Sequence, residues 1–347
     1  MRRIRPLLLA ALLPAPAAPL AGQSPQRYEL QGAQVEIYNL VGSARVEAGS
    51  GNTVQVEVTT GGADAGKLKV EAEGGTLRVL FPGDRIRYSR MEHGGSTTIR
   101  VDEDGTFDGH QHGGQRVRIS RDQGDLEAWA DLRITVPAGR SLEVHLAVGR
   151  IAAANVNGRL RLEAAAAPVT IAGGRGDLSV STASGDIRAS GGSGPARLST
   201  GSGEIEVSTW SGGDIEAETG SGGVTATDIE SPRLRAQTGS GDVRLSKVRA
   251  TDVGVQTGSG DVTLELQSVV QALDVETRSG DVSIVAPPST SARLDIETGS
   301  GDIESDFPLA VTRSGRHHLT GTIGDGKGRV TIGTGSGGVR LMRARGA

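Results

Sequence analysis

The chain contains no cysteine, and this absence excludes three features. A disulfide framework, a thiol nucleophile and a bacterial lipoprotein anchor each require a residue that the sequence lacks. Aromatic residues make up only 2% of the 347 residues, so a core rich in rings and ring platforms for sugars are not expected. The 13 prolines are too few for a proline-rich linker protein.

The chain also has no excess of positive charge. It carries 37 basic and 41 acidic residues, which gives a net charge of −4. Removal of a leader that contains Arg2, Arg3 and Arg5 would leave 34 basic residues against 41 acids, a net charge of −7. Nucleic-acid binding usually depends on a basic surface, so no nucleic-acid partner is expected.

Residues 1–22 have the organisation of a secretory signal peptide. A basic start is followed by the apolar stretch Leu7–Leu13, and then by a segment rich in Ala and Pro that ends near Gly22. The apolar stretch is too short to span a bilayer as a helix, and no later segment resembles a transmembrane helix. The sequence predicts export by signal peptide to the periplasm, the cell surface or the extracellular space.

A strand-rich N-terminal region, residues 23–140, follows the leader. Five segments alternate apolar and polar residues with the period of a half-buried strand. They are Val35–Tyr38, Val54–Val58, Leu68–Val70, Leu77–Phe81 and Leu132–Val136. Residues 82–117, rich in charge, Gly and His, interrupt this pattern and are interpreted as a long, solvated surface insertion.

Residues 141–347 contain a repeat, which is the strongest signal in the chain. The motif is Thr-x-Ser-Gly followed by Asp, Glu or Gly and then Val or Ile. It begins at Thr182, Thr200, Thr219, Thr238, Thr257, Thr277, Thr298 and Thr334. Successive Thr residues are 18, 19, 19, 19, 20, 21 and 36 residues apart. The last interval contains Phe307–Lys327, interpreted as an insertion or a degenerate coil before the final coil.

Each repeat contains two short alternating strands, one before the Thr and one after the Gly, as in Val253–Gln256 and Asp261–Leu264. Each coil therefore turns two pairs of apolar residues toward one axis. Because ordering a coil costs more free energy than its few apolar side chains supply, the coils must stack. Gly permits a sharp corner through a positive φ or a close backbone approach. The pattern predicts about ten coils whose equivalent strands pair in parallel. Degenerate first coils are expected near Val144–Ile151 and Leu160–Ile171.

The repeated Thr-Gly-Ser-Gly-Asp-Val, its period of 18–21 residues and the strand-rich N-terminal region resemble the DUF4097 family of bacterial beta-strand-repeat proteins, which are labelled adhesins. The resemblance covers essentially the whole chain after the leader. It implies an all-β fold, a single-stranded parallel β-helix (β-solenoid), and an envelope or surface location. It carries over no catalytic motif.

Acidic residues at the corners are the first candidates for chemistry. One file of stacked acids is expected to contain Asp242, Asp261, Asp281 and Asp302. Asp186 and Glu204, from earlier repeats, belong to the same file. Their mutual repulsion requires an offset. Either each carboxylate accepts hydrogen bonds from the amides of its own turn, or the file binds a cation such as Ca²⁺. We expect the first, so no metal or cofactor is predicted.

Three further candidates are weaker. Asp102–Asp108 begins like a Ca²⁺ loop but has Gly113 where the twelfth-position Glu belongs. His93, His110 and His112 could ligate a transition metal, although a solvated loop is the favoured interpretation. An exposed row of Thr could resemble an ice-binding face, but a hydrogen-bonded Thr ladder fits a Gly corner better.

The composition and the repeat favour a protein without catalytic activity. Trp210 is the only Trp of the array, the loops between coils are short, and no Gly-x-Ser-x-Gly elbow lies in a strand-to-helix context. No catalytic residue is therefore assigned, and a carbohydrate-active β-helix enzyme is the least favoured alternative.

The expected function is an exported adhesin-like protein that presents a polar flank to an unidentified glycan, surface or envelope protein. Outward residues that turn acidic toward the C-terminus define this flank: Gln237, Gln256, Glu276 and Glu297, with Asp274 and Asp295 beside them. The alternative is an internal cell-envelope scaffold that self-associates end to end. An adhesin is expected to have capped ends, and a scaffold an open last coil.

Overall fold

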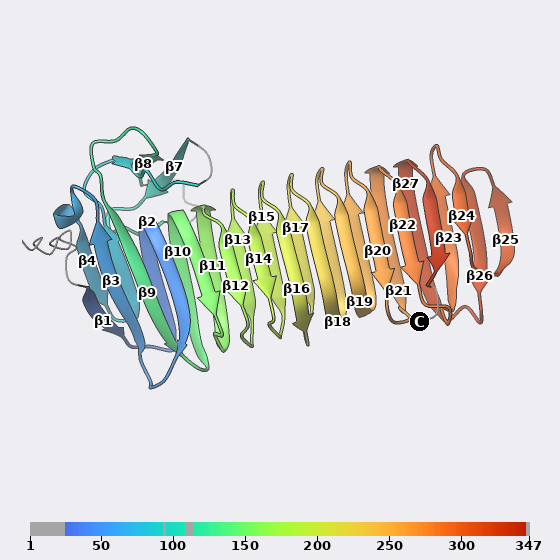
Figure 1. Cartoon of the computed structure of the whole chain (residues 1–347), viewed down its shortest axis with the longest axis horizontal. Coiled ribbons are helices and arrows are strands. Elements are labelled where there is room, and N and C mark those ends of the chain that lie inside the picture. Colours follow the sequence, from blue (N-terminus) through green and yellow to red (C-terminus); the bar gives the residue numbers. More distant parts are fainter. Residues whose placement is uncertain (1–24, 93–94, 108–113, 345–347) are drawn as a thin grey trace, which may run out of the picture.

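The structure is a computed structural model that describes residues 25–92, 95–107 and 114–344. The predicted signal peptide lies outside the described residues. Strands stack side by side along an elongated molecule (Figure 1) and form one sheet of 25 strands and a second sheet of three. The described elements are strands apart from one 3-10 turn, η1 (Ala65–Lys67), so the predicted all-β class is confirmed. No described segment is a helix with the length and apolar character needed to cross a membrane.

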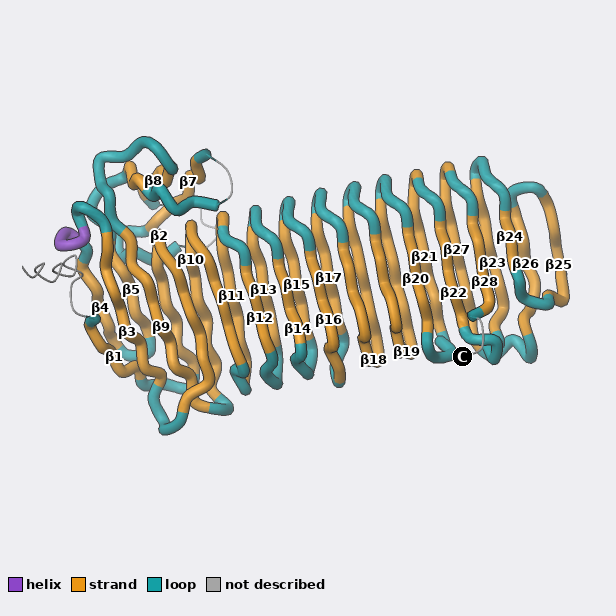
Figure 2. The backbone as a smooth tube through the Cα atoms, viewed as in Figure 1, coloured by secondary structure: helices purple, strands orange, loops and turns teal. Residues whose placement is uncertain are grey.

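Each coil supplies one strand to each of two faces, joined by a corner at one edge and by a return loop at the other (Figure 2). In spatial order the first face contains β4 (Lys69–Glu73), β5 (Thr76–Leu80), the first halves of β2 (Gln34–Gly49) and β10 (Arg140–Ala154), β11 (Gly158–Ala166), β13 (Leu178–Thr182), β15 (Ala196–Thr200), β17 (Ile215–Thr219), the second halves of β18 (Val224–Thr238) and β19 (Val243–Thr257), β21 (Ala272–Ser279), β27 (Gly328–Ser336), β23 (Ala292–Thr298), β26 (His318–Ile323) and β25 (Leu309–Gly315).

The second face continues the same coils. In spatial order it contains β1 (Gln26–Leu30), β3 (Val54–Gly61), β9 (Trp129–Pro137), the second halves of β2 and β10, β12 (Val169–Ala172), β14 (Ile187–Ser190), β16 (Ile205–Ser211), the first halves of β18 and β19, β20 (Val262–Leu266), β22 (Val282–Ala286), β28 (Val339–Arg343) and β24 (Ile303–Ser305). Successive coils of the array pair in parallel on both faces, as the repeat predicted.

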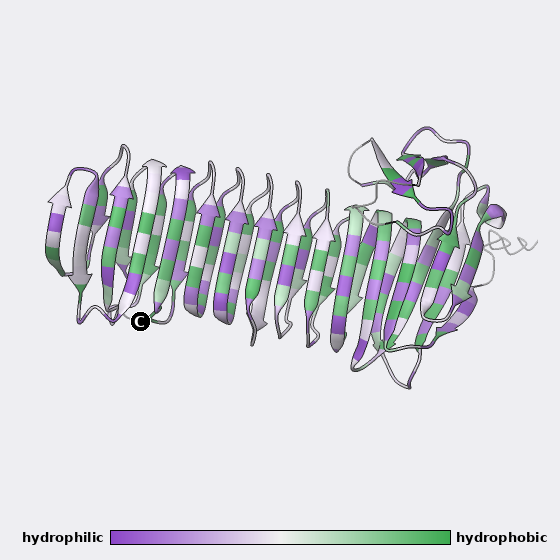
Figure 3. Cartoon of the chain, turned by 180° about the vertical axis from the view of Figure 1, so that it is seen from behind, coloured by the Kyte–Doolittle hydropathy of each residue, from purple (hydrophilic) through white to green (hydrophobic). Residues whose placement is uncertain are grey.

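Side chains alternate between interior and solvent along the strands. In β19, for example, Val243 and Leu245 are buried, while Arg244 between them is exposed. Figure 3 shows this alternation as apolar and polar bands that run from strand to strand. Inward residues of successive coils join one continuous hydrophobic cluster, so the two inward pairs predicted for each coil are confirmed.

Close packing of successive coils explains the corner glycines. A Cβ atom added to Gly241 would lie 2.0 Å from the carbonyl oxygen of Gly222 in the preceding coil. No larger residue fits at that distance unless the corner moves. Of the two reasons predicted for these glycines, close backbone approach is therefore the one that applies at Gly241.

The N-terminal strands continue the stack and then close it. All five predicted N-terminal strands are present, and β2 pairs in parallel with β10 over both faces. Beyond β2, antiparallel partners follow: β3 pairs with β9, β1 with β3, and β4 with β5. The large sheet is therefore mixed, and the strand-rich N-terminal region, whose pairing the sequence left open, contains the antiparallel partners at this end.

The 82–117 insertion is not the solvated polar loop that was expected. Its described residues include the three-stranded sheet formed by β6 (Arg85–Arg87), β7 (Ser96–Val101) and β8 (Gln115–Ser120). Ile86, Val101 and Val117 lie in a second hydrophobic cluster together with residues of β2 and β10. The insertion therefore packs against the first coils. Its alternating apolar residues were overlooked in the sequence because its overall composition is polar.

The last coil of the chain is not the last coil of the stack. Strand β27 lies between β21 and β23, and β28 lies between β22 and β24. The segment Phe307–Lys327 contains the hairpin β25–β26, and β26 pairs in antiparallel with the outer edge of β23. The expected sequential order is wrong here: the chain turns back and inserts its final coil between two earlier coils.

Candidate functional site

The Thr of each corner motif is a buried structural residue. The Thr200 hydroxyl donates to the carbonyl oxygen of Gly185 in the preceding coil (2.9 Å) and accepts from the amide of Gly203 in its own corner (3.1 Å). The eight corner Thr residues are 3–7% exposed. An exposed Thr face is therefore excluded, because the hydroxyls are used to tie one coil to the next.

The corner acids also bond between coils. Asp242 Oδ1 accepts from the amide of Asp261 (3.0 Å), and Asp261 Oδ1 accepts from the amide of Asp281 (2.9 Å). The donor amide belongs to the next coil, which corrects the expectation that each acid bonds to its own turn. The Asp261 amide, followed by the Arg244 guanidinium, lowers the pKa of Asp242. These contacts offset the repulsion along the file.

The inserted coil interrupts the acidic file. Gly338 stands between Asp281 and Asp302, and its amide donates to Asp281 Oδ1 (2.8 Å). The expectation of four adjacent stacked acids is therefore wrong for Asp302. Within the described ranges, no group of three potential metal ligands includes a corner acid.

A polar groove follows the first face along the row of outward residues next to the corners. Its lining includes Glu218, Gln237, Gln256, Glu276, Arg278, Glu297 and backbone of the neighbouring Thr-Gly corners. The predicted flank is therefore largely brought together in one groove. Gln237 Nε2 donates to Gln256 Oε1 (2.8 Å), and Gln256 Nε2 donates toward Glu276 Oε2 (3.4 Å). Amides and carboxylates at successive coils form a continuous polar row.

The inserted coil also divides this row. Gly333 lies between Glu276 and Glu297, and a Cβ added to Gly333 would meet nothing within 4 Å. The predicted neighbours Glu276 and Glu297 are therefore separated by an open step one strand wide. Asp274 and Asp295 are separated in the same way by Thr331.

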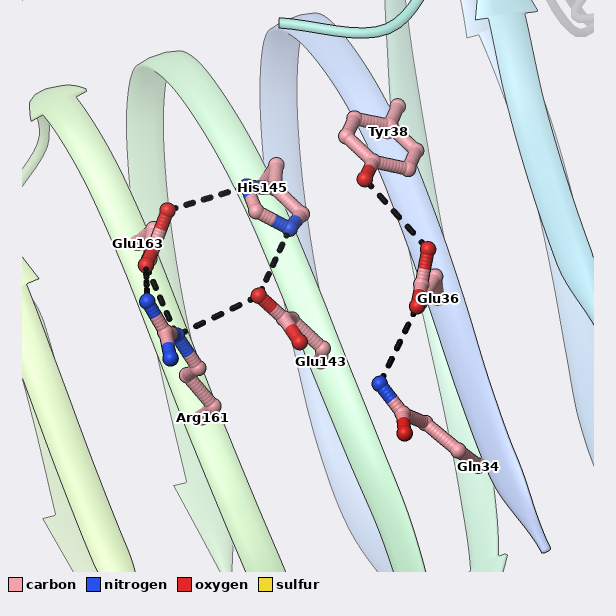
Figure 4. A network of polar contacts seen from close by, with 7 residues as sticks. All are labelled: Gln34, Glu36, Tyr38, Glu143, His145, Arg161 and Glu163. Atoms are coloured by element: carbon pink, nitrogen blue, oxygen red, sulfur yellow. Dashed lines mark hydrogen bonds and ion pairs between the residues drawn. The ribbon is translucent and has the colours of Figure 1, made fainter. Parts of the chain in front are cut away.

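A cluster that the sequence did not single out lies at the other end of the same face (Figure 4). His145 on β10 stands between Tyr38 on β2 and Glu163 on β11 in one row across three strands. His145 Nδ1 lies 3.2 Å from Glu163 Oε2, and Nε2 lies 3.1 Å from Glu143 Oε1. Arg161 donates to Glu163 through Nε (2.7 Å).

The electrostatics of this cluster are strongly perturbed. Hydrogen bonding from His145, and then from Arg161, lowers the pKa of Glu163 to about 2 despite its partial burial. Burial, together with the charges of Glu36 and Glu143, raises the pKa of Tyr38 to about 12. The pKa of Glu163 is therefore lowered mainly by hydrogen bonding, and the pKa of Tyr38 is raised mainly by burial.

Glu143, His145 and Glu163 each place a potential metal-ligand atom within 4.8 Å of the others. The two carboxylates of this cluster face different nitrogens of one imidazole ring, so one ion cannot replace both contacts, and Arg161 already pairs with both acids. A second group, Asp295, Glu297 and His318, lies in the C-terminal part of the first face, with both acids exposed. In the first group the guanidinium of Arg161 competes with a metal ion for both acids, and in the second group the exposed acids are solvated.

Two sequence candidates remain to be placed. His93, His110 and His112 lie outside the described residues. In the segment whose sequence begins like a Ca²⁺ loop, Asp104 Oδ1 accepts hydrogen bonds from the amide and the hydroxyl of Thr106 (3.0 and 2.7 Å). This carboxylate therefore closes a local turn.

The fold and the groove define a β-solenoid-like repeat protein with an extended polar face. The sequence profile of the family described as Toastrack DUF4097 matches residues 130–342, which is more than half of the chain. The chain belongs to this family, as its repeat indicated.

Other comparisons add little. No curated protein matches the chain at a significant level. Among solved structures, a "putative cell adhesion protein from Clostridium sporogenes" is similar at 10% identity, with 92% of this chain and 100% of that chain covered and a TM-score of 0.19.

Proposed function

We propose that the chain is an exported, non-enzymatic surface or envelope protein that uses its polar groove to hold a hydroxyl-rich polymer such as a glycan. The main observation behind this proposal is the row Gln237, Gln256 and Glu276, which repeats amide or carboxylate groups at three successive coils. Such groups accept from and donate to hydroxyls, and a stack of parallel strands repeats them about every 4.8 Å. The signal peptide predicted from the sequence at residues 1–22 supports export.

Binding at a single groove should be weak. Among the residues that the structure describes, the groove lining contains no aromatic ring on which a sugar could stack and only one basic side chain, Arg278. Hydrogen bonds to solvated hydroxyls contribute only about 0.5–1.5 kcal/mol each, because each replaces a bond to water. Useful adhesion would therefore come from many copies displayed together on one surface.

The geometry of the groove favours binding over hydrolysis. A glycosidase needs a carboxylic acid in a desolvated position, opposite a second carboxylate. Glu297 lies beside the open step at Gly333. Its side chain is 72% exposed and pairs with His318 (3.2 Å). This exposure supports an assignment without catalytic activity.

The alternative, an internal scaffold that assembles end to end, has one observation in its favour. Within the part of the chain that the structure describes, β4 and β25 pair on one side only and lie at opposite ends of the first face. Against it, the register of β25 shifts between Val311 and Arg313. An irregularity and a charged residue at an edge strand both discourage pairing with another chain.

The proposal is tested by retention on immobilised glycans and cells. The double variant Gln256→Ala with Glu276→Ala should bind about tenfold more weakly than the unchanged protein, which corresponds to the loss of one or two hydrogen bonds. Thr263→Ala, on the opposite face, is the matched control and should bind normally. Release of product from envelope polysaccharides would refute the non-enzymatic assignment, and absence of retention on every surface would favour the scaffold.

A further inference from the structure

A missing side chain interrupts the polar row of the groove at Gly333. In strand order, the outward residues of this row are Glu218, Gln237, Gln256, Glu276, Gly333 and Glu297. All of them line the groove, and Gly333 on β27 is the member of the row without a side chain. Because neighbouring strands lie about 4.8 Å apart, Glu276 and Glu297 stand about 9.6 Å apart on either side of the open step.

Neither the backbone nor the packing requires a glycine at this position. Gly333 lies inside β27 without the left-handed φ that favours glycine, and a Cβ atom there would have no described atom within 4 Å. Gly335 differs, because its Cβ would lie 2.5 Å from the carbonyl oxygen of Arg278. A glycine inside a strand costs stability, and it often marks a place where a ligand approaches the backbone. The open step is therefore a feature of the groove surface, not a requirement of the fold.

The space left open is that of one glutamine side chain. Glutamines occupy the equivalent positions of β18 and β19, where Gln237 Nε2 donates to Gln256 Oε1 (2.8 Å). Gln256 Nε2 donates in turn toward Glu276 Oε2 (3.4 Å), so each amide of the row donates to the next coil. A planar amide of the same size in the open step would continue this pattern.

The walls of the open step accept hydrogen bonds. A carboxylate has about four acceptor positions, so Glu276 can accept from a ligand as well as from Gln256. Glu297 faces His318 through Oε1 (3.2 Å), and its second oxygen is available to the groove. Arg278, in the neighbouring corner, lines the same groove and supplies a donor. A ligand group with one N–H donor and one carbonyl acceptor therefore matches this part of the groove.

We propose that the open step at Gly333 holds the acetamido group of an N-acetylated amino sugar, so that the groove binds a glycan that contains such sugars. The acetamido group is a planar amide about as large as the missing side chain. Its N–H would donate to Glu276 or Glu297, and its carbonyl oxygen would accept from Arg278. This inference rests on the proposed function, because it assigns the class of sugar that the same groove holds.

Two related sugars match the open step less well. A hydroxyl group at the same ring carbon would leave most of the space to water. A protonated amino group would pair with the carboxylates, but it would also leave the space largely unfilled, and exposed ion pairs contribute little. The acetamido group combines the required size with the required donor.

Three hexasaccharides with the same β-linked glucose backbone provide the test. They differ in one substituent of each ring, which is an acetamido group in the N-acetylglucosamine hexamer, an amino group in the glucosamine hexamer and a hydroxyl group in cellohexaose. NMR titration of the full chain measures their affinities. The N-acetylglucosamine hexamer should bind about tenfold more tightly than cellohexaose, the effect of about one hydrogen bond to a charged acceptor. Saturation transfer from the protein should be strongest at its acetamido methyl protons.

Gly333→Gln fills the open step with an amide that belongs to the protein. This variant should melt no lower than the unchanged protein, bind cellohexaose normally and bind the N-acetylglucosamine hexamer no better than cellohexaose. Gly254→Gln is the matched control. Gly254 also lies inside a strand of the first face, and its Cβ would meet Arg235 Cγ at 3.7 Å, but it is not part of the groove lining. The control should change neither affinity.

Failure of this inference can be distinguished from failure of the proposed function. If the double variant Gln256→Ala with Glu276→Ala weakens binding of cellohexaose, but the N-acetylglucosamine hexamer binds no better than cellohexaose, the groove holds glycans and the acetamido assignment is wrong. Tighter binding of the glucosamine hexamer than of its acetylated form, or an unchanged preference in Gly333→Gln, would also overturn the assignment. Absence of binding by all three hexasaccharides would overturn both proposals.

Discussion

Substituting Val262 by Asp is the sharpest test of the coil register. Val262 opens β20 and lies between Val243 of β19 and Val282 of β22, and all three are at most 1% exposed. The next residue, Thr263, is exposed on the second face. One step along the chain therefore separates a position sealed between two coils from a position in water.

The expected cost can be worked from this burial. Loss of the buried valine side chain removes about 1.5–3 kcal/mol, and burial of a polar group without a partner costs a further ~2–7 kcal/mol. The sum is comparable with the ~5–15 kcal/mol that stabilises a typical domain. Because coils contact only their neighbours, the damage should centre on the coils next to β20.

Urea unfolding followed by circular dichroism measures the effect. Val262→Asp should abolish the cooperative transition or lower its midpoint strongly, whereas Thr263→Lys should change stability by no more than about 0.5 kcal/mol. Burial favours the neutral acid, so the pKa of the new Asp should rise in the folded state and the defect should deepen as pH increases above about 4. Equal effects of the two substitutions would refute the register.

Three further predictions concern the order of the last coils, the carboxylate of Glu163 and metal binding. Because the chain has no cysteine, Asp274→Cys combined with Thr331→Cys should cross-link with a short bifunctional reagent more readily than Asp274→Cys combined with Asp295→Cys; the reverse would mean that the final coil is not inserted. The unchanged protein should lose stability relative to Glu163→Gln as pH falls from about 4.5 to about 2, since the pKa of Glu163 is lowered in the folded state; parallel titrations of both proteins would contradict this. EDTA should leave the melting temperature unchanged, and a rise on adding Ca²⁺ would return the corner acids to the list of metal ligands.

The buried positions of the repeat array could be predicted from the sequence, because the pattern that defines them lies within each repeat. Alternation around each Thr-x-Ser-Gly corner states which side chains face inward, and Val243 and Leu245 follow it. The nearly equal spacing of the corner motifs then determines which residues of adjacent coils pair, since coils of similar length stack in register. The groove residues Gln237, Gln256 and Glu276 could be grouped for the same reason.

The order of the last coils could not be predicted, because their corners are almost interchangeable. The motifs at Thr298 and Thr334 present the same hydroxyl and glycines to a preceding coil. The Thr334 hydroxyl donates to Gly280, and the Thr298 hydroxyl donates to Gly337. Only the path of Phe307–Lys327 decides which coil lies beside Thr277, and that path depends on tertiary pairing of its hairpin with β23.

The His145 cluster was missed for a related reason. Its members are 18 residues apart along the repeat in the case of His145 and Glu163, but 107 apart in the case of Tyr38 and His145. A histidine between alternating polar residues on a strand gives no local sign that a distant ring will cover it. The one usable signal was Glu143 two residues before His145, with Glu163 one coil later.

Insertion of the final coil also determines how the stack ends. If the final coil stacked outside the coil that contains Thr298, it would expose a strand edge on which another coil with the same repeat pattern could pair in parallel. Instead, β23 is covered on its outer side by antiparallel β26, and its inner side is filled by β27. The hairpin that caps the array thus also directs the last coil inward. An antiparallel cap does not present the register that a further Thr-x-Ser-Gly coil needs, so this arrangement limits growth of the repeat on the first face. Among the described strands of the second face, β24 is the last and pairs only with β28, so the cap covers one face of the two.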